Sequence, residues 1–260
     1  MADNVPISAE VVGATREDLI CILAWLKREY DEDGGSGFWC NRCVISDALG
    51  KPGNLWIIRQ NGEAVAFQVG EYAADILSVR KEHQKCGLAT SLLEASIERA
   101  EAANVNVLSV QCAPETSLGF WKRMGFEEYS DPHLPNHLMA RRVLPRTFDL
   151  PANLPAVGVV ICFYPEAAQN SGGENIRPII EHRVAGVRDH DGSITLVRRV
   201  LGFCDDEPDG RDLTIKIEVN GAKRCFCKAK HQGAQVVGVQ QDHIGNAFFI
   251  DRVAPEQGAE

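Results

Sequence analysis

Two hydrophobic periods alternate along the first half of the chain. Apolar residues recur at helical spacing in three segments, and they alternate or run on continuously in the segments between, which is typical of strands. Thr15 can cap the first helix, because Asp18 follows three residues later. Asn61-Gly62 separates two apolar runs and predicts a tight hairpin. This pattern predicts an α/β domain. Helices are expected at 15–30, 88–103 and 117–124, and strands at 55–60, 64–69, 75–80, 105–112, 126–129 and 137–143.

The second half of the chain has only the strand period. Apolar and polar residues alternate over 213–219, as in a strand with one buried face. Asn220-Gly221 and Asp191-Gly192 are further hairpin signals. We therefore expect a predominantly antiparallel β domain, either a small barrel or a sandwich. The other extended segments are expected at 156–164, 179–188, 193–203, 222–230, 234–240 and 246–253.

A proline-rich stretch separates the two halves. Pro145, Pro151 and Pro155 interrupt a segment that has no hydrophobic period. Proline fixes φ and lacks an N–H, so this segment is poor material for a helix or a sheet. We expect a linker here, with one domain at 1–147 and a second at 148–260.

Charge and composition exclude several classes of protein. The chain has 27 Lys and Arg against 36 Asp and Glu, a net charge of -9, whereas nucleic-acid-binding proteins usually carry a basic surplus. No segment has the roughly 20 consecutive apolar residues of a membrane-spanning helix, and the first residues lack the pattern of a secretion signal. Nine cysteines, an odd number scattered over the chain, indicate reduced thiols. We therefore expect a cytoplasmic protein that binds neither nucleic acid nor a membrane.

The segment 76–100 carries a recognisable chemical pattern. An apolar strand leads into a short loop at 84–89, which opens directly into an amphipathic helix. The first turn of a helix has unpaired N–H groups and the positive end of the helix dipole, so it attracts anions. Gly87 lets a ligand approach the backbone closely, and Lys85 adds a positive charge. The loop is a candidate phosphate site, and the alternative is an ordinary turn that needs a glycine.

With its neighbours, this loop resembles the GNAT N-acetyltransferase family. Two motifs of that family occur here in the right order, between the right elements. The first is Q-x-x-G-x-A after an L-x-V strand, and the second is an aromatic pair followed three residues later by Gly-Phe. The matching residues are Gln84, Gly87 and Ala89 with Leu77 and Val79, and then Phe120-Trp121 with Gly125-Phe126. The resemblance covers about 8–143 and implies a mixed, mostly antiparallel sheet with flanking helices and acetyl-CoA as co-substrate.

The resemblance also implies how the coenzyme is held. In this family the strand backbone pairs with the pantetheine arm, and the amides of the loop hold the pyrophosphate. A backbone N–H near Leu77 would stabilise the oxyanion of the transition state. The reaction is expected in a ternary complex, without an acyl-enzyme. The implied cofactor-binding residues are Leu77, Ser78, Val79, Gln84, Lys85, Cys86, Gly87, Leu88, Ala89 and Thr90.

The catalytic groups depart from the family pattern. A primary amine is mostly protonated at neutral pH and must lose a proton before it attacks. The glutamate that some family members use as the base falls on Ala73, so Asp75 and Glu71, which share its strand parity, are the candidate bases. For each, the alternative is a solvated carboxylate at a strand end. Trp121 replaces the usual tyrosine acid and Pro114 the usual asparagine, which favours a water-relayed mechanism.

The acceptor is indicated only by charge. In this family the loop after the first helix and the last strand pair line the acceptor site. An acidic rim there would attract a polyamine, an aminoglycoside or a basic peptide, and the alternative is a solvated loop of like charges. The candidate substrate-binding residues are Glu29, Asp31, Glu32 and Asp33.

No metal site is predicted. Cys40 and Cys43 form a CxxC, and Cys225 and Cys227 form a CxC, but neither has a second pair at matching spacing.

Taken with the family resemblance, the sequence predicts an N-acetyltransferase that moves an acetyl group from acetyl-CoA to a small-molecule or peptidyl primary amine. The alternative is an acyl-CoA-binding sensor or scaffold that has lost turnover. Assembly into a homodimer stays open, and no motif assigns a role to the β domain.

Overall fold

The computed structural model describes residues 10–131, 134–171, 176–206, 212–242 and 247–256. The chain divides into two compact units. The N-terminal unit comprises 1–127 with 140–142, and the C-terminal unit comprises 128–139 with 143–260. Each unit has its own core. No helix in the described ranges is both long and apolar enough to cross a membrane.

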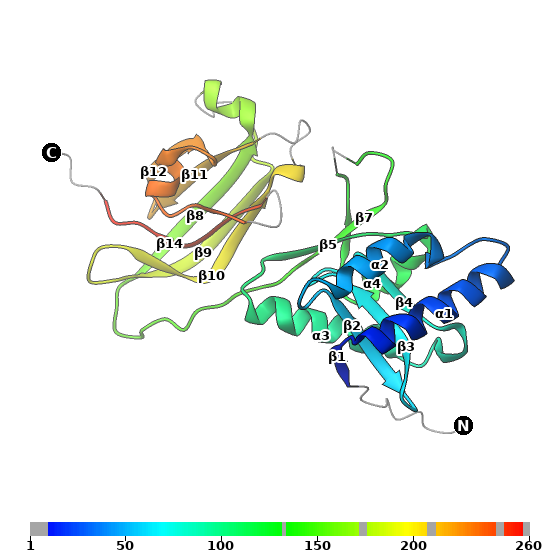
Figure 1. The fold of residues 1–260 in the computed structure, drawn as a ribbon. Helices are drawn as coiled ribbons and strands as arrows, with labels where there is room; N and C mark the ends of the chain where they lie inside the picture. Colours follow the sequence, from blue (N-terminus) through cyan, green and yellow to red (C-terminus); the bar gives the residue numbers. More distant parts are fainter. Residues whose placement is uncertain (1–9, 132–133, 172–175, 207–211, 243–246, 257–260) are drawn as a thin grey trace, which may run out of the picture. The chain divides into compact units, whose positions relative to one another are not determined.

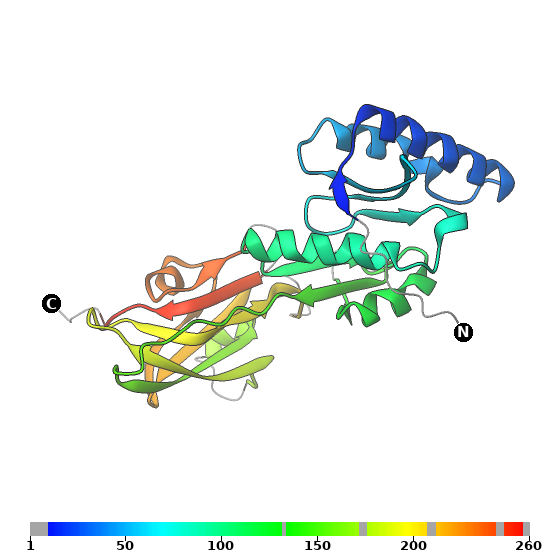
Figure 2. The ribbon, with the colours of Figure 1, turned by 90° about the horizontal axis from the view of Figure 1, so that it is seen from below.

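An antiparallel sheet of four strands organises the N-terminal unit. Its order is β1-β2-β3-β4, the strands being β1 (Val11–Gly13), β2 (Leu55–Gln60), β3 (Glu63–Val69) and β4 (Ile76–Val79). Three α-helices accompany it, namely α1 (Arg16–Glu32), α2 (Arg42–Leu49) and α3 (Leu88–Ala102). Figure 1 and Figure 2 show α1 and α2 over one face of the sheet and α3 over the other. Because helices cover both faces of the sheet, the side chains of β3 are buried from Ala64 to Val69, and nearly all of them are apolar.

The side chains of β2 and β3 divide between two cores. Ile57 and Phe67 pack with Trp25 of α1 in the core under α1 and α2, whereas Ile58 and Ala66 pack beneath α3. Successive residues of a strand point to opposite faces, so one strand supplies both cores. The predicted cap of α1 is confirmed: the Thr15 N–H donates to Asp18 over 2.7 Å, and the Asp18 N–H donates to the Thr15 hydroxyl.

After α3 the chain forms a second, smaller sheet. Its order is β5-β7-β6, from β5 (Val107–Gln111), β6 (Glu127–Tyr129) and β7 (Met139–Val143), with α4 (Leu118–Arg123) between β5 and β6. β4 and β5 are therefore edge strands of two different sheets. Within the described residues, no strand pairs with the outer edge of β4. That edge keeps backbone groups available for a ligand.

The C-terminal unit is an antiparallel sheet of seven strands in the order β12-β11-β8-β9-β10-β14-β13 (Figure 1, green to red). Its strands are β8 (Ala156–Pro165), β9 (Ile180–Arg188), β10 (Ile194–Phe203), β11 (Leu213–Val219), β12 (Ala222–Lys228), β13 (Gln240–Gln241) and β14 (Ala247–Val253). Apolar residues from one face of this sheet form a core with the short helix α5 (Gln232–Val236). The antiparallel α/β and β fold classes expected from the two hydrophobic periods are confirmed.

Two local expectations differ from the structure. The segment 234–240 was expected to be extended, but its first residues belong to α5 and only Gln240–Gln241 is strand. The helical turn is held by packing, because Ala234 is completely buried in the core of the sheet. The 3-10 turn η1 (Phe38–Asn41) and α2 were not expected at all. The domain boundary at residue 147 stays a prediction.

Gly202 of β10 supplies a stability test of the C-terminal unit. A Cβ at this position would lie 2.4 Å from the ring of Phe163, whereas a Cβ at Gly158 of β8 would meet nothing closer than 3.9 Å. Overpacking a core costs about 1–3 kcal/mol. We therefore expect Gly202→Ala to lower the free energy of unfolding by about 2 kcal/mol in urea titrations. Gly158→Ala is the matched control, and an equal loss in both variants would contradict this account.

Candidate active site

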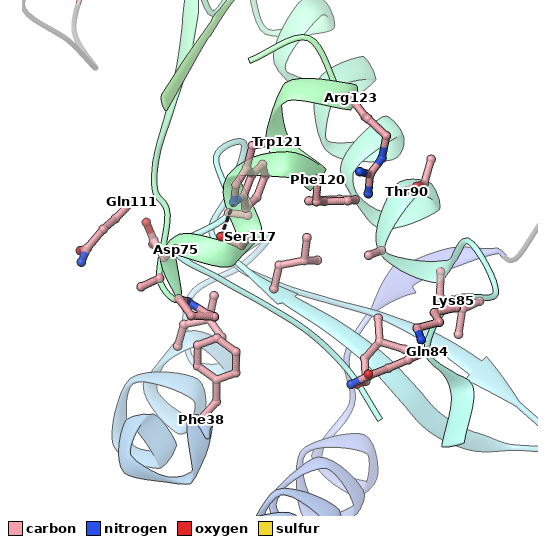
Figure 3. Close-up of a pocket in the computed structure, with 18 of the residues that line it drawn as sticks. Phe38, Asp75, Gln84, Lys85, Thr90, Gln111, Ser117, Phe120, Trp121 and Arg123 are labelled. Atoms are coloured by element: carbon pink, nitrogen blue, oxygen red, sulfur yellow. Dashed lines mark hydrogen bonds between the residues drawn. The ribbon is translucent and has the colours of Figure 1, made fainter. Parts of the chain in front are cut away.

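A pocket of about 750 Å³ lies in the N-terminal unit, and every residue that lines it belongs to that unit. Its walls come from β4, the start of α3, the end of β5, α4 and the turn η1. Figure 3 shows Phe38, Asp75 and Gln111 on one side of this space and Gln84, Lys85, Thr90 and Arg123 on the other. The pocket is thus lined by the edge strand β4 of one sheet and by the end of the edge strand β5 of the other.

The outer edge of β4 faces this pocket with its backbone. The Arg80 N–H donates to Val65 O over 2.9 Å, and the register continues through Val79 opposite Ala66 and Leu77 opposite Gln68. Hydrogen-bonded and non-hydrogen-bonded pairs alternate in an antiparallel ladder. The N–H and C=O groups of Leu77 and Val79 therefore point away from β3. The Gln84 side-chain amide donates to Val79 O over 3.0 Å, which agrees with this direction.

The start of α3 forms the opposite part of the pocket. Lys85 and Gly87 both have left-handed backbones, at φ +61° and +84°. The first intrahelical bond is from the Ser91 N–H to Gly87 O, at 3.0 Å, and no side chain caps the helix. The N–H groups of Leu88 and Ala89 precede that bond, so they have no intrahelical acceptor. With no acidic residue in its first turn, α3 presents a positive end to the pocket.

This end of the pocket fits a diphosphate. A Cβ built on Gly87 meets no atom within 4 Å, so the space beside the loop is open. Lys85 and Arg123 line the same region and supply positive charge. Helix amides together with such side chains form a phosphate site. The residues present therefore have the chemistry needed to hold the diphosphate of coenzyme A.

Asp75 stands at the other end of the pocket, just before β4. Its N–H donates to Val69 O over 2.9 Å, which holds the backbone at the end of the ladder. The side chain is exposed at the rim, yet the surrounding wall removes enough hydration from the carboxyl to raise its pKa above the ordinary value; the charge of Lys51 opposes this shift. A carboxyl with a raised pKa is a stronger base once ionised.

The pocket unites most of the residues predicted to bind the coenzyme. Eight of those ten residues line it; Ser78 and Cys86 do not. The Cys86 thiol instead donates to Gln84 O over 3.5 Å. Of the two candidate bases, Glu71 also lies outside the lining. The Tyr72 hydroxyl donates to the Glu71 carboxylate, and this bond raises the pKa of Tyr72.

The four acidic residues predicted for the acceptor lie outside the pocket lining. Three of them bind basic or backbone groups. Glu29 accepts the Lys81 N–H at 2.9 Å, Asp33 accepts the Lys81 ammonium at 2.6 Å, and Asp31 pairs with Lys27 on the same helix. Glu32 is exposed. These contacts tie the end of α1 to the turn that follows β4.

Several lining residues had no individual sequence signal. Phe38 and Asn41 come from η1, Gln111 from the end of β5 and Arg123 from α4. Of the residues that α4 contributes to the lining, the aromatic pair Phe120-Trp121 belonged to a sequence motif. The Trp121 indole N–H donates to the Ser117 hydroxyl over 3.2 Å, and its ring packs edge-on against Phe126 with centroids 5.2 Å apart. The aromatic pair and the later Gly-Phe are therefore parts of one packing unit.

No group of three or more potential metal-ligating side chains occurs among the residues that the structure describes. Cys225 and Cys227 lie two residues apart on β12 and are hydrogen-bonded to each other, which lowers the pKa of Cys227 to about 7. This pair packs against the core of the C-terminal unit.

Residues 51–128 match the family model of the acetyltransferase (GNAT) domain. The matched range contains β4, Asp75 and the start of α3, and so most of the pocket. The N-terminal unit therefore contains a GNAT acetyltransferase domain. The recognised resemblance is confirmed for that range, and the GNAT domain accounts for the Gln84–Gly87–Ala89 motif at the start of α3.

Solved structures to which part of this chain is similar include three acetyltransferases. A GCN5-related N-acetyltransferase from Rhodopseudomonas palustris is 14% identical, covers 54% of this chain and 98% of its own, and has a TM-score of 0.42. The ribosomal-protein-S18-alanine N-acetyltransferase of Escherichia coli is 18% identical; the match covers 56% of this chain and 98% of that protein, with a TM-score of 0.40. PaiA N-acetyltransferase of Thermoplasma acidophilum, in complex with coenzyme A, is 10% identical; the match covers 53% of this chain and 100% of that protein, with a TM-score of 0.42. No curated protein matches the chain.

Proposed function

We propose that this protein is an N-acetyltransferase that transfers the acetyl group of acetyl-CoA to a primary amine, by direct attack in a ternary complex. One observation carries the proposal. The same pocket has an anion-binding helix start at one end, the open edge of β4 along its wall, and a carboxyl with a raised pKa at the other end. Donor and acceptor can thus meet within one space.

The start of α3 would hold the donor. The amides from Lys85 to Thr90 and the charges of Lys85 and Arg123 bind the diphosphate. The outer edge of β4 then offers the C=O of Leu77 and the N–H of Val79 to the amide groups of the pantetheine arm, in the manner of an added strand. This arrangement orients the thioester toward Asp75.

Two groups would carry the chemistry at the acceptor end. Asp75 accepts a proton from the ammonium, directly or through water, and so makes the amine nucleophilic. The Leu77 N–H, on the open edge of β4, donates to the oxygen that becomes negative as the amine attacks. Much of the remaining acceleration comes from positioning the two reactants.

The leaving thiolate has no acidic side chain at the family's tyrosine position. Trp121 occupies it, and its N–H already donates to Ser117. An indole N–H is not an acid at neutral pH, so the thiolate would leave as such or take a proton from water. This replacement is the one observation that favours the second candidate, an acyl-CoA-binding sensor without turnover.

A steady-state thiol-release assay separates the two candidates. With acetyl-CoA and a panel of primary amines, we expect free thiol and acetylated amine to appear in equal amounts, because each transfer releases one coenzyme A. Mass spectrometry of the product checks that the nitrogen is acetylated. Tight binding of acetyl-CoA in calorimetry, with no thiol released by any amine, would instead support the sensor.

A further inference from the structure

We propose that the acceptor carries a single primary ammonium group on an uncharged, largely apolar body, and is not a polycation. This inference rests on the proposed function and names the substrate class of the same pocket. Its basis is the distribution of charge and apolar surface along the pocket wall.

The charges of the lining are divided between the two ends. Asp75 is the one carboxylate among the described residues that line the pocket, whereas Lys85 and Arg123 lie toward the start of α3. Figure 3 shows Asp75 on the opposite side of the space from both cations. One ammonium group can therefore pair with Asp75. A second ammonium within the pocket would be desolvated without a carboxylate partner, which is unfavourable.

The acidic residues that suggested a polycation are engaged elsewhere. Lys81 binds both Glu29 and Asp33, and Lys27 binds Asp31. All three carboxylates lie outside the pocket lining. Two of the four carboxylates, Asp31 and Asp33, are thus paired with ammonium groups of the same chain, and Glu29 accepts a backbone N–H.

The wall around Asp75 is otherwise neutral and partly apolar. Phe38 and Asn41 line it from η1, Ala74 from the residue before Asp75, and Pro114 from the chain after β5. The Phe38 ring is half-buried and packs against the core under α1 and α2, so it forms a fixed apolar surface. Gln111 and Asn41 add uncharged amide groups to the pocket lining. An acceptor with one cationic end and an apolar body matches this lining.

Two sources have this chemistry: a small alkyl or aryl monoamine, and the free α-amine of an uncharged peptide. We would measure kcat/KM by thiol release at saturating acetyl-CoA for phenethylamine, an amidated Ala-Leu-Ala peptide, spermidine and an oligolysine peptide. The expected result is that phenethylamine or the neutral peptide exceeds both polycations by at least about tenfold, a typical discrimination for an apolar pocket. Whichever of phenethylamine and the neutral peptide has the higher kcat/KM shows whether the acceptor is a small monoamine or a peptide. A higher kcat/KM for spermidine or oligolysine would overturn the inference.

Variants at the acceptor wall give a second test. Phe38→Leu keeps much of the packing but removes the ring, and we expect the KM of phenethylamine to rise about tenfold while the Kd of acetyl-CoA stays unchanged. Asn41→Ala repeats the test at a residue outside the core. Glu32→Gln, at an exposed carboxylate outside the pocket, is the matched control. If Glu32→Gln alone weakens acceptor binding, the acidic cluster is the recognition site and the inference is wrong.

Failure of the proposed function is recognised separately. Absence of acetyl-CoA binding in calorimetry, or of thiol release with every amine, overturns the proposed function and this inference together. Turnover with a preference for polycations overturns the inference alone, because it leaves acetyl transfer intact.

Discussion

Replacing Gly87 with glutamate is expected to raise the Kd of acetyl-CoA by at least about 100-fold. The Gly87 backbone is left-handed, at φ +84°, and the space that its Cβ would enter is open pocket. A carboxylate placed there would lie beside the diphosphate, and like charges about 4 Å apart near a protein surface repel by several kcal/mol. Its bulk would also fill the approach to the amides of α3. Isothermal titration calorimetry with acetyl-CoA measures the effect directly.

Gly62 supplies the matched control for this substitution. It lies in the turn between β2 and β3, has the same φ of +84°, and a Cβ there also meets no atom within 4 Å. Gly87→Glu and the control Gly62→Glu therefore carry the same penalty for a left-handed backbone, about 1–2 kcal/mol. We expect both to lower Tm to a similar extent, but only Gly87→Glu to weaken acetyl-CoA binding. Unchanged affinity in Gly87→Glu would remove the start of α3 as the diphosphate site.

The second large effect is expected from Asp75→Asn. An amide cannot accept the ammonium proton, so kcat/KM should fall by about 100-fold or more, the usual contribution of a general base. In the natural protein the rate rises as the carboxyl ionises. Because the surrounding wall partly desolvates the Asp75 carboxyl and raises its pKa, this rise begins above the range of an ordinary aspartate. In the variant that part of the pH profile should disappear. The rise that remains should follow deprotonation of the substrate's ammonium group.

The same variant should not unfold the GNAT domain at neutral pH. A carboxyl whose pKa is higher in the folded state binds its proton more tightly there, so the fold is favoured at low pH and that advantage is lost as the pH rises through the raised pKa. Removing the charge at neutral pH therefore removes an unfavourable contribution. Circular dichroism melts of the two proteins at pH 7 check this point.

Glu71→Gln decides between the two candidate bases. Glu71 lies four residues earlier in the same loop, outside the pocket lining and hydrogen-bonded to Tyr72. We expect its pH profile to match that of the natural protein. Loss of the acidic limb in Glu71→Gln, with the limb retained in Asp75→Asn, would assign the base to Glu71.

The acidic residues at the end of α1 illustrate how charge along a sequence can mislead. In the sequence they form a rim of like charges that would attract a polycation. In the structure Lys81, which is 52 residues away from Glu29 along the chain, binds two of them. The sequence contains Lys81, but no local pattern connects it to this cluster. Only the packing of α1 beside the turn after β4 does so.

The sequence by itself determined the features that depend on neighbours along the chain. The two hydrophobic periods predicted the α/β and β regions, because the faces of helices and strands follow directly from residue spacing. The Thr15 cap and the glycine loop before α3 were also predictable, since each is a local backbone arrangement. For the same reason eight of the ten residues predicted for the coenzyme line the pocket, as they belong to one continuous strand, loop and helix.

The tertiary structure alone decided the acceptor end. Phe38, Asp75 and Gln111 are far apart in the chain and line the same pocket because β4 and β5 are edge strands of two separate sheets and η1 contributes to the same wall. Packing likewise left Glu71 outside the pocket and turned part of 234–240 into a helix around the buried Ala234. These outcomes depend on contacts between distant segments, whose free energies a local pattern does not contain.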